Sequence, residues 1–161
     1  MSPSSFARID LAKTSEAALV VADASVLVEL VIDGRHRAGA EALLERYADP
    51  QTRLTFVSAA HGLIEAASAL RRLVRQRAVA ATDGAAAVRW LGELDIVLDA
   101  TAPRLPRIWA LRDRMSAYDA AYAAAADAID VPLLTADSRL LRACQHEGVP
   151  AQHIDELASG A

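Results

Sequence analysis

Cysteine and lysine are almost missing from this chain: each occurs once among its 161 residues, as Cys144 and Lys13. A lone cysteine cannot form an internal disulfide, so a reducing compartment is expected. Cys144 lies among apolar neighbours in an expected helix, which indicates a packing role rather than a nucleophile. The four histidines form no His-Glu-x-x-His motif, and paired Cys-x-x-Cys motifs are also absent. The sequence therefore predicts no zinc site.

Long apolar runs and an excess of positive charge are lacking too. The apolar run at 17–32 is too short to span a membrane, and it contains Asp23 and Glu29. Residues 1–17 have no apolar core of the kind found in signal peptides, so we expect a polar N-terminal tail and a cytoplasmic protein. A formal net charge of −4 argues against a protein that coats nucleic acid through bulk charge. This net charge is still compatible with an enzyme that has a local rim of arginines.

What the chain does contain is a regular alternation of short β-branched runs and longer amphipathic segments. Residues 18–158 are expected to form one domain. Strands are predicted at 19–22, 54–57, 95–98 and 131–135, with a short edge strand at 152–154. Helices are predicted at 24–32, 36–47, 58–77, 82–91, 103–114, 116–129 and 137–146, with Ser58 as the cap of the third. This alternation predicts an α/β fold, a three-layer α/β/α sandwich around a mainly parallel sheet.

Two aspartates each stand between a predicted strand and the helix that follows it. Asp23 lies in VVADASVLVEL and Asp137 in VPLLTADSRLL. Each is a good N-cap, a structural role worth about 0.5–2 kcal/mol. In an open parallel sheet, however, the strand ends that lead into helices share one edge, where ligands bind. Asp23 and Asp137 are therefore expected on the same rim, each with a hydroxyl two residues away, on Ser25 and Thr135, that can orient a carboxylate.

Two further acids belong to predicted helices. Asp119 follows Ser116 at capping-box spacing and suits the positive end of its helix, so a structural role also accounts for it. The alanine-rich face after Asp119 allows a close approach to the sheet, which would bring the first turn of the helix towards the rim. Glu65 falls outside the apolar stripe of its helix. Periodicity alone predicts that Glu65 is solvated or paired with Arg72.

If the four acids converge, their mutual repulsion is the main energetic problem. Two like charges about 4 Å apart cost around 4 kcal/mol at an effective dielectric constant of about 20. A divalent cation between the carboxylates removes that cost. Ligands that are all oxygen favour Mg²⁺ or Mn²⁺.

Four segments, VVADASVLVEL, SAAHGLIEAASALRR, SAYDAAYAAAAD and LLTADSRLL, each carry one of these acids. In order and spacing they resemble the PIN-domain ribonucleases, and among these the VapC toxins of type II toxin–antitoxin systems. The resemblance covers residues 19–155. It implies a catalytic, metal-binding quartet in which Asp23 and Asp119 are the main Mg²⁺ ligands and Glu65 and Asp137 complete the cluster directly or through water. Ser25 and Thr135 fall where the family often has supporting hydroxyls.

The resemblance also implies an activity and partners. Such a protein is a Mg²⁺-dependent endoribonuclease, with Mn²⁺ as an alternative ion, that hydrolyses RNA phosphodiester bonds and is held silent by a small cognate antitoxin. A homodimer or a toxin–antitoxin hetero-oligomer is expected, with the apolar early helices as a candidate groove. The structural alternative for these helices is core packing or a homodimer interface. Rim arginines would hold the RNA backbone, although each is also explained as a solvated helix arginine: Arg71, Arg72, Arg112, Arg114 and Arg139.

Two other functions fit part of this pattern. A receiver domain also gathers acids and Mg²⁺ at a sheet edge, with Asp23 here as the phospho-acceptor. Receiver domains usually add paired acids beside the first strand and a late lysine, whereas Lys13 precedes Asp23 and no acid stands beside it. An inactive PIN scaffold that only binds partners is the second alternative, and the complete quartet argues against it.

Overall fold

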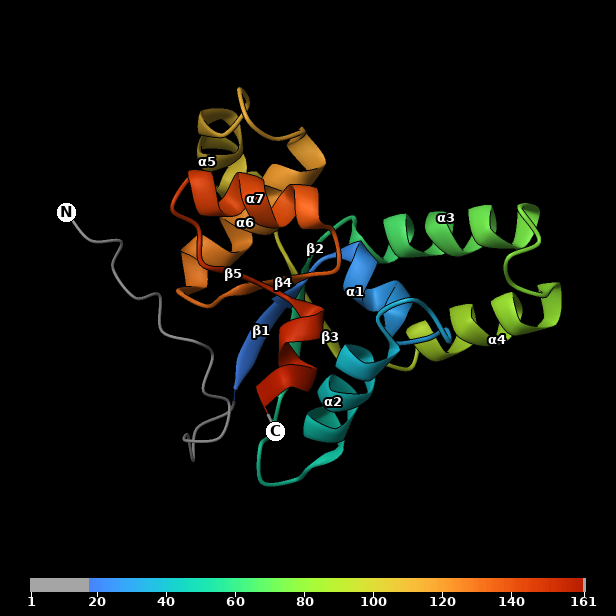
Figure 1. The fold of residues 1–161 in the computed structure, drawn as a ribbon. Coiled ribbons are helices and arrows are strands. Elements are labelled where there is room, and N and C mark those ends of the chain that lie inside the picture. The colour runs from blue at the N-terminus through green and yellow to red at the C-terminus, as the bar shows by residue number, and fades with distance from the viewer. Residues whose placement is uncertain (1–17, 161) are drawn as a thin grey trace.

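A five-stranded parallel sheet forms the centre of the protein, in the order β3-β2-β1-β4-β5 (Figure 1). The computed structural model describes residues 18–160, and the predicted polar tail at 1–17 lies outside them. The strands are β1 Leu19–Ala22, β2 Thr55–Ala59, β3 Ile96–Asp99, β4 Leu133–Thr135 and β5 Ala151–His153. Every strand pair is parallel, which confirms the predicted α/β class and its mainly parallel sheet.

Helices connect all five strands and cover both faces of the sheet (Figure 1). The strand order reverses direction at β1, so right-handed crossovers put the helices before β3 on one face and those after it on the other. The helices of the first face are α1 Ala24–Glu29, α2 Arg37–Ala48, α3 Gly62–Arg75 and α4 Ala81–Leu91. Those of the second are η1 Ala102–Arg104, α5 Leu105–Ala110, α6 Ala117–Ile129 and α7 Ser138–His146, and the short η2 Ile154–Gly160 follows β5.

Small side chains let α6 lie close against the sheet. The run Ala123–Ala126 is almost wholly buried, and α6 contacts β1, β2 and β4. The strands bury β-branched and leucine side chains in the same core, with Val21 and Leu133 at 0% exposure. Cys144 is also fully buried, and burial raises the pKa of its thiol to about 12, which agrees with the predicted packing role. The alanine content of the chain is therefore used for close packing, and this brings the first turn of α6 to the edge of the sheet.

Ser58 does not cap the third helix, which corrects one prediction. Strand β2 extends through Ala59, and the buried Ser58 hydroxyl donates to the carbonyl of Ala22 on β1 at 2.8 Å. The helix begins later, at Gly62, where a Cβ would lie 2.3 Å from the Ser58 oxygen. The Ser58 hydroxyl thus links β2 to β1, and glycine is needed at position 62 because α3 passes close to this hydroxyl.

The helix predicted at 103–114 is also shorter than expected, since α5 ends at Ala110. No helix within residues 18–160 is long and apolar enough to cross a membrane.

Candidate active site

Asp23 lies where β1 passes into α1, and it is almost completely buried, with 4% exposure. Its Oδ1 accepts hydrogen bonds from the Val26 backbone N–H at 3.0 Å and from the Ser25 hydroxyl at 2.6 Å. Its Oδ2 accepts from the Thr135 hydroxyl at 2.7 Å. Asp23 is therefore an N-cap, as the structural interpretation predicts. It is also a desolvated carboxylate, which a cap does not require.

Burial raises the pKa of Asp23 to about 6, because desolvation disfavours the charged form. The hydrogen bonds from Ser25, Thr135 and Val26 oppose that effect only in part, and the nearby charge of Asp137 adds to it. A carboxylate held in this environment gains stability from any cation that binds beside it.

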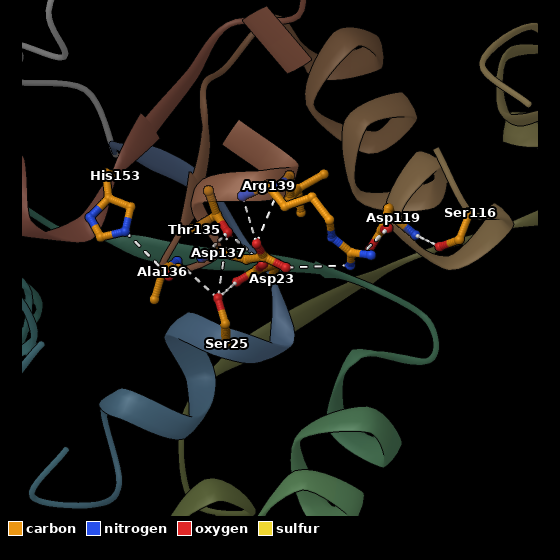
Figure 2. A network of polar contacts seen from close by, with 10 residues as sticks. Asp23, Ser25, Ser116, Asp119, Thr135, Ala136, Asp137, Arg139 and His153 are labelled. Atoms are coloured by element: carbon orange, nitrogen blue, oxygen red, sulfur yellow. Dashed lines mark hydrogen bonds and ion pairs between the residues drawn. The ribbon is translucent and has the colours of Figure 1, made fainter. Parts of the chain in front are cut away.

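The two predicted hydroxyls connect the β1–α1 turn to the β4–α7 turn (Figure 2). The Ser25 hydroxyl accepts from the Ala136 N–H at 2.8 Å, and the Thr135 hydroxyl accepts from the Asp137 N–H at 2.9 Å. Each hydroxyl also donates to Asp23, so both are fixed at two points. These hydrogen bonds thereby fix the position of Asp23 relative to Asp137 at the edge of the sheet.

Asp137 and Asp119 occupy the first turns of α7 and α6. Asp137 caps α7, and its Oδ1 accepts from the backbone N–H groups of Arg139 at 2.7 Å and Leu140 at 3.4 Å. The Ser116 hydroxyl caps α6 by accepting from the Asp119 N–H at 3.1 Å, as the capping-box spacing predicts. The carboxylate of Asp119 points towards the Asp23–Asp137 edge (Figure 2).

Glu65 reaches the site from α3, and its partner is Tyr122. The Tyr122 hydroxyl donates to Glu65 Oε2 at 2.8 Å, and His61 Nε2 lies 3.6 Å from the same oxygen. Burial, followed by the bond to Glu65, raises the pKa of Tyr122, so the phenol remains a donor. Arg72 lines the same cavity, but the polar contacts of Glu65 run to Tyr122 and His61. Sequence reasoning missed Tyr122, although it follows Asp119 by one helical turn.

All four predicted acids line one cavity of about 370 Å³. Asp23, Glu65, Asp119 and Asp137 come from α3, α6 and the two turns that follow β1 and β4. Arg139 partly screens their charges (Figure 2), with its Nη2 atom 3.7 Å from Asp119 and 3.5 Å from Asp137. Its side chain is 75% exposed, so these ion pairs contribute little stability.

The five predicted arginines divide into two groups. Arg72 and Arg139 line the acidic cavity, and Arg71, Arg72 and Arg75 line a neighbouring depression of about 530 Å³ that shares Ser68 with it. Arg112 stacks on Trp109 and pairs with Asp113. Arg114 lies 3.8 Å from Glu147. The structure thus places three of the five arginines beside the acids, on α3 and in the first turn of α7, and it places the other two after α5.

The donors in this cavity suit a hard divalent cation. The four acids offer oxygen atoms alone, and one of them is buried with a raised pKa. Mg²⁺ and Mn²⁺ prefer such ligands, whereas zinc sites usually contain histidine or cysteine. The residues present therefore fit the ion that the sequence suggests.

This chain is similar in sequence to several known proteins. The PIN domain family matches residues 20–145. Ribonuclease VapC9 of Mycobacterium tuberculosis is 41% identical over 76 residues, which are 47% of this chain and 60% of that protein. Ribonuclease VapC1 of the same organism is 40% identical over 92 residues, 55% of this chain and 65% of VapC1, so the match spans less than two thirds of either relative.

The fold has a match among solved structures as well. PAE2754 from Pyrobaculum aerophilum superposes with a TM-score of 0.62 and 23% identity, covering 91% of this chain and 96% of PAE2754. That likeness concerns the fold, while the family match covers most of the chain, including all four acids of the cavity. This chain belongs to the PIN domain family.

Proposed function

We propose that this protein is a divalent-cation-dependent endoribonuclease that acts as the toxin of a toxin–antitoxin pair. The observation that carries the proposal is the convergence of Asp23, Glu65, Asp119 and Asp137 on one cavity from separate parts of the chain. Family membership and the names of the similar VapC ribonucleases support the same activity. An RNA substrate also agrees with a cytoplasmic location.

Each acid has a role in this proposal. Asp23 and Asp119 hold the Mg²⁺ or Mn²⁺ ion, and Glu65 and Asp137 complete the cluster directly or through water. The ion supplies positive charge that favours ionisation of water near neutral pH and stabilises charge on the phosphate and the leaving oxygen. Ser25 and Thr135 keep Asp23 oriented, and Tyr122 positions Glu65.

The reaction is hydrolysis of an RNA phosphodiester. Water attacks phosphorus and the P–O3′ bond breaks, which leaves a 5′-phosphate on one product and a 3′-hydroxyl on the other. Glu65 and Asp137 are the more exposed acids, at 44% and 37% of the side chain, so they face the solvent that supplies the water. Arg72 and Arg139 at the cavity, with Arg71 beside it, contact the RNA backbone.

The structure favours this function over a phospho-acceptor role for Asp23. Both carboxylate oxygens of Asp23 already accept hydrogen bonds, and the side chain is buried among them. A phosphoryl group on Asp23 would displace the contacts that hold the sheet edge together.

An apolar groove between α1, α2 and α4 is the proposed binding site of the antitoxin. Val31, Ile32 and Trp90 line two adjoining depressions there, of about 560 and 310 Å³. Most of α1 packs the core instead, since Val26 and Leu27 are fully buried, so only its C-terminal end faces the groove. An amphipathic segment of the antitoxin laid across Trp90 would bury this apolar surface.

The activity is tested with purified protein and structured RNA, with Mg²⁺ or with EDTA. We expect cleavage with Mg²⁺ alone, 5′-phosphate on the products, and loss of cleavage in Asp23→Asn and Asp119→Asn. Asp83→Asn is the matched control, because Asp83 lies on α4 and does not line the acidic cavity. Cleavage that persists in Asp23→Asn or Asp119→Asn rules the mechanism out.

The partner and assembly are tested separately. Co-expression with the open reading frames beside the gene is expected to yield a complex that Trp90→Ala weakens, and size-exclusion chromatography gives the assembly with and without the partner. A monodisperse monomer that is harmless when overexpressed alone contradicts both the toxin role and the expected homodimer.

A further inference from the structure

A second cluster of metal-ligating side chains lies outside the acidic cavity. His36 immediately precedes α2, His153 is the last residue of β5, and Asp155 lies in the first turn of η2. One ligand atom from each of these residues lies within 4.8 Å of the other two. The residues that line the acidic cavity include none of the three.

The ligand atoms of this cluster lie close to the spacing of a tetrahedral metal site. His36 Nδ1 is 2.8 Å from Asp155 Oδ2 and 3.0 Å from Asp155 Oδ1, and His153 Nδ1 is 3.4 Å from Asp155 Oδ2. Zinc–ligand bonds of about 2.0–2.2 Å in tetrahedral geometry put neighbouring ligand atoms about 3.3–3.5 Å apart. The His153–Asp155 spacing already equals this value, the His36–Asp155 contact must lengthen by about half an ångström, and the ligand atoms of the two histidines lie within 4.8 Å of each other.

Hydrogen bonds fix His153 in the form that a metal requires. Its Nε2 lies 3.2 Å from the carbonyl oxygen of Ala136, which accepts only from a protonated nitrogen (Figure 2). Its Nδ1 accepts from the Asp155 N–H at 3.3 Å, so that nitrogen carries the lone pair, and a metal ion would take the place of this long hydrogen bond. Metal-ligating histidines are held in this way, with the remote N–H on a backbone carbonyl and the other nitrogen facing the ion.

Burial gives the cluster an inner wall and an open side. The side chains of His36 and His153 are 17% and 13% exposed, whereas Asp155 is 54% exposed. The two imidazole rings meet edge to face with centroids 5.0 Å apart. Asp155 thus leaves a route for an ion from solvent, and the histidines are already positioned by packing.

We propose that His36, His153 and Asp155 bind one Zn²⁺ ion, at a site separate from the four carboxylates. Two imidazole nitrogens favour Zn²⁺ over Mg²⁺, and the oxygen ligands of the acidic cavity favour Mg²⁺. Three protein ligands leave a fourth position for solvent. The ion would tie η2 to the start of α2, where the carbonyl of Ile154 already packs against Gly39. This inference stands independently of the nuclease proposal.

The test is binding of Co²⁺ and Zn²⁺ to the full chain in buffer with millimolar Mg²⁺, which competes with them for the carboxylate cavity. Co²⁺ in a tetrahedral site absorbs strongly in the visible range, and Zn²⁺ added afterwards removes that absorption. We expect one equivalent of Co²⁺ to give this spectrum in the wild type, in Asp119→Asn, and in the matched control His146→Gln. His146 is an exposed histidine at the end of α7.

Loss of any one ligand is expected to weaken Zn²⁺ binding at least about 10–100-fold, the scale seen for groups that merely support metal ligands. The variants are His36→Gln, His153→Gln and the shape-conserving Asp155→Asn, each checked for folding by circular dichroism. Zn²⁺ at about 100 times its dissociation constant is expected to raise the melting temperature of the wild type by about 5–10 °C, and not that of the variants. An octahedral Co²⁺ spectrum, or equal affinity in folded variants and wild type, overturns the proposal. Dependence of binding on Asp119 overturns it as well.

Discussion

Replacing Asp23 by asparagine is expected to stabilise the metal-free protein, although it removes a residue that caps a helix. In the folded chain the pKa of Asp23 is raised to about 6 from its ordinary value of 3.8. A raised carboxylate pKa means that the folded state favours the protonated form of the side chain. The corresponding stability is present in full below about pH 4 and is lost as the pH rises through about 6.

The magnitude follows from that rise. At about 1.4 kcal/mol per pKa unit, the ionised side chain costs the fold about 3 kcal/mol near pH 7.5. Asparagine avoids the charge, but its amide faces the Thr135 hydroxyl, which now donates to Oδ2 and also accepts from the Asp137 N–H. Disturbing that bond costs about 1 kcal/mol. The net gain is therefore about 1–3 kcal/mol, which raises the melting temperature by roughly 2–10 °C.

Urea unfolding in EDTA measures this effect, at about pH 7.5 and again at about pH 4.5, where the Asp23 side chain of the wild type is mostly protonated. We expect Asp23→Asn to be more stable than the wild type at the higher pH and to lose that advantage at the lower one. Asp83→Asn, the exposed control, should change little at either pH. If Asp23→Asn is destabilised equally at both pH values, Asp23 acts only as a cap, and the reasoning from desolvation is wrong.

Three further substitutions test other parts of the site and fold. Tyr122→Phe removes the hydrogen bond to Glu65 and is expected to lower the cleavage rate about 10-fold with little change in melting temperature. The exposed Tyr118→Phe is its control, and an unchanged cleavage rate in Tyr122→Phe contradicts the positioning role. Arg139→Ala removes a cation beside Asp119 and Asp137, so the Mg²⁺ affinity measured by calorimetry should rise up to about 5-fold while RNA binding weakens. Weaker Mg²⁺ binding in this variant would refute the idea that Arg139 competes with the ion for the carboxylates. Ser58→Ala leaves the Ala22 carbonyl without its hydroxyl donor and should lower the free energy of unfolding by about 1–2 kcal/mol, with the Mg²⁺ affinity unchanged.

The acids at strand ends could be predicted from the sequence because parallel topology alone places them together. Asp23 and Asp137 follow strands that pair directly, so the proximity of the two side chains depends only on the strand order of the sheet. Asp119 could be predicted in part, since the alanines after it allow a close approach to the sheet. The extent to which Asp23 is buried, and hence its raised pKa, could not be predicted, because desolvation depends on how distant parts of the chain pack around the side chain.

Contacts between residues distant in the sequence account for what sequence reasoning missed. Periodicity alone makes Glu65 look solvated, because its partner Tyr122 lies 57 residues away on another helix. Only the resemblance to PIN-domain ribonucleases named Glu65 as a site residue. Ser58 has the pattern of a helix cap, but its hydroxyl meets a strand carbonyl 36 residues earlier. The cluster of His36, His153 and Asp155 forms no motif, since 119 residues separate the first from the last. Only the folded chain brings these groups together.

Calorimetric titration of Mg²⁺ or Mn²⁺ into the protein tests most directly whether the four carboxylates share a cation. We expect saturable binding to the wild type and to Asp83→Asn, with strong loss in each of Asp23→Asn, Asp119→Asn and Glu65→Gln. Binding that is unchanged in folded Asp119→Asn or Glu65→Gln would show that the acids of this cavity do not act on a common ion, and it would contradict the proposed active site.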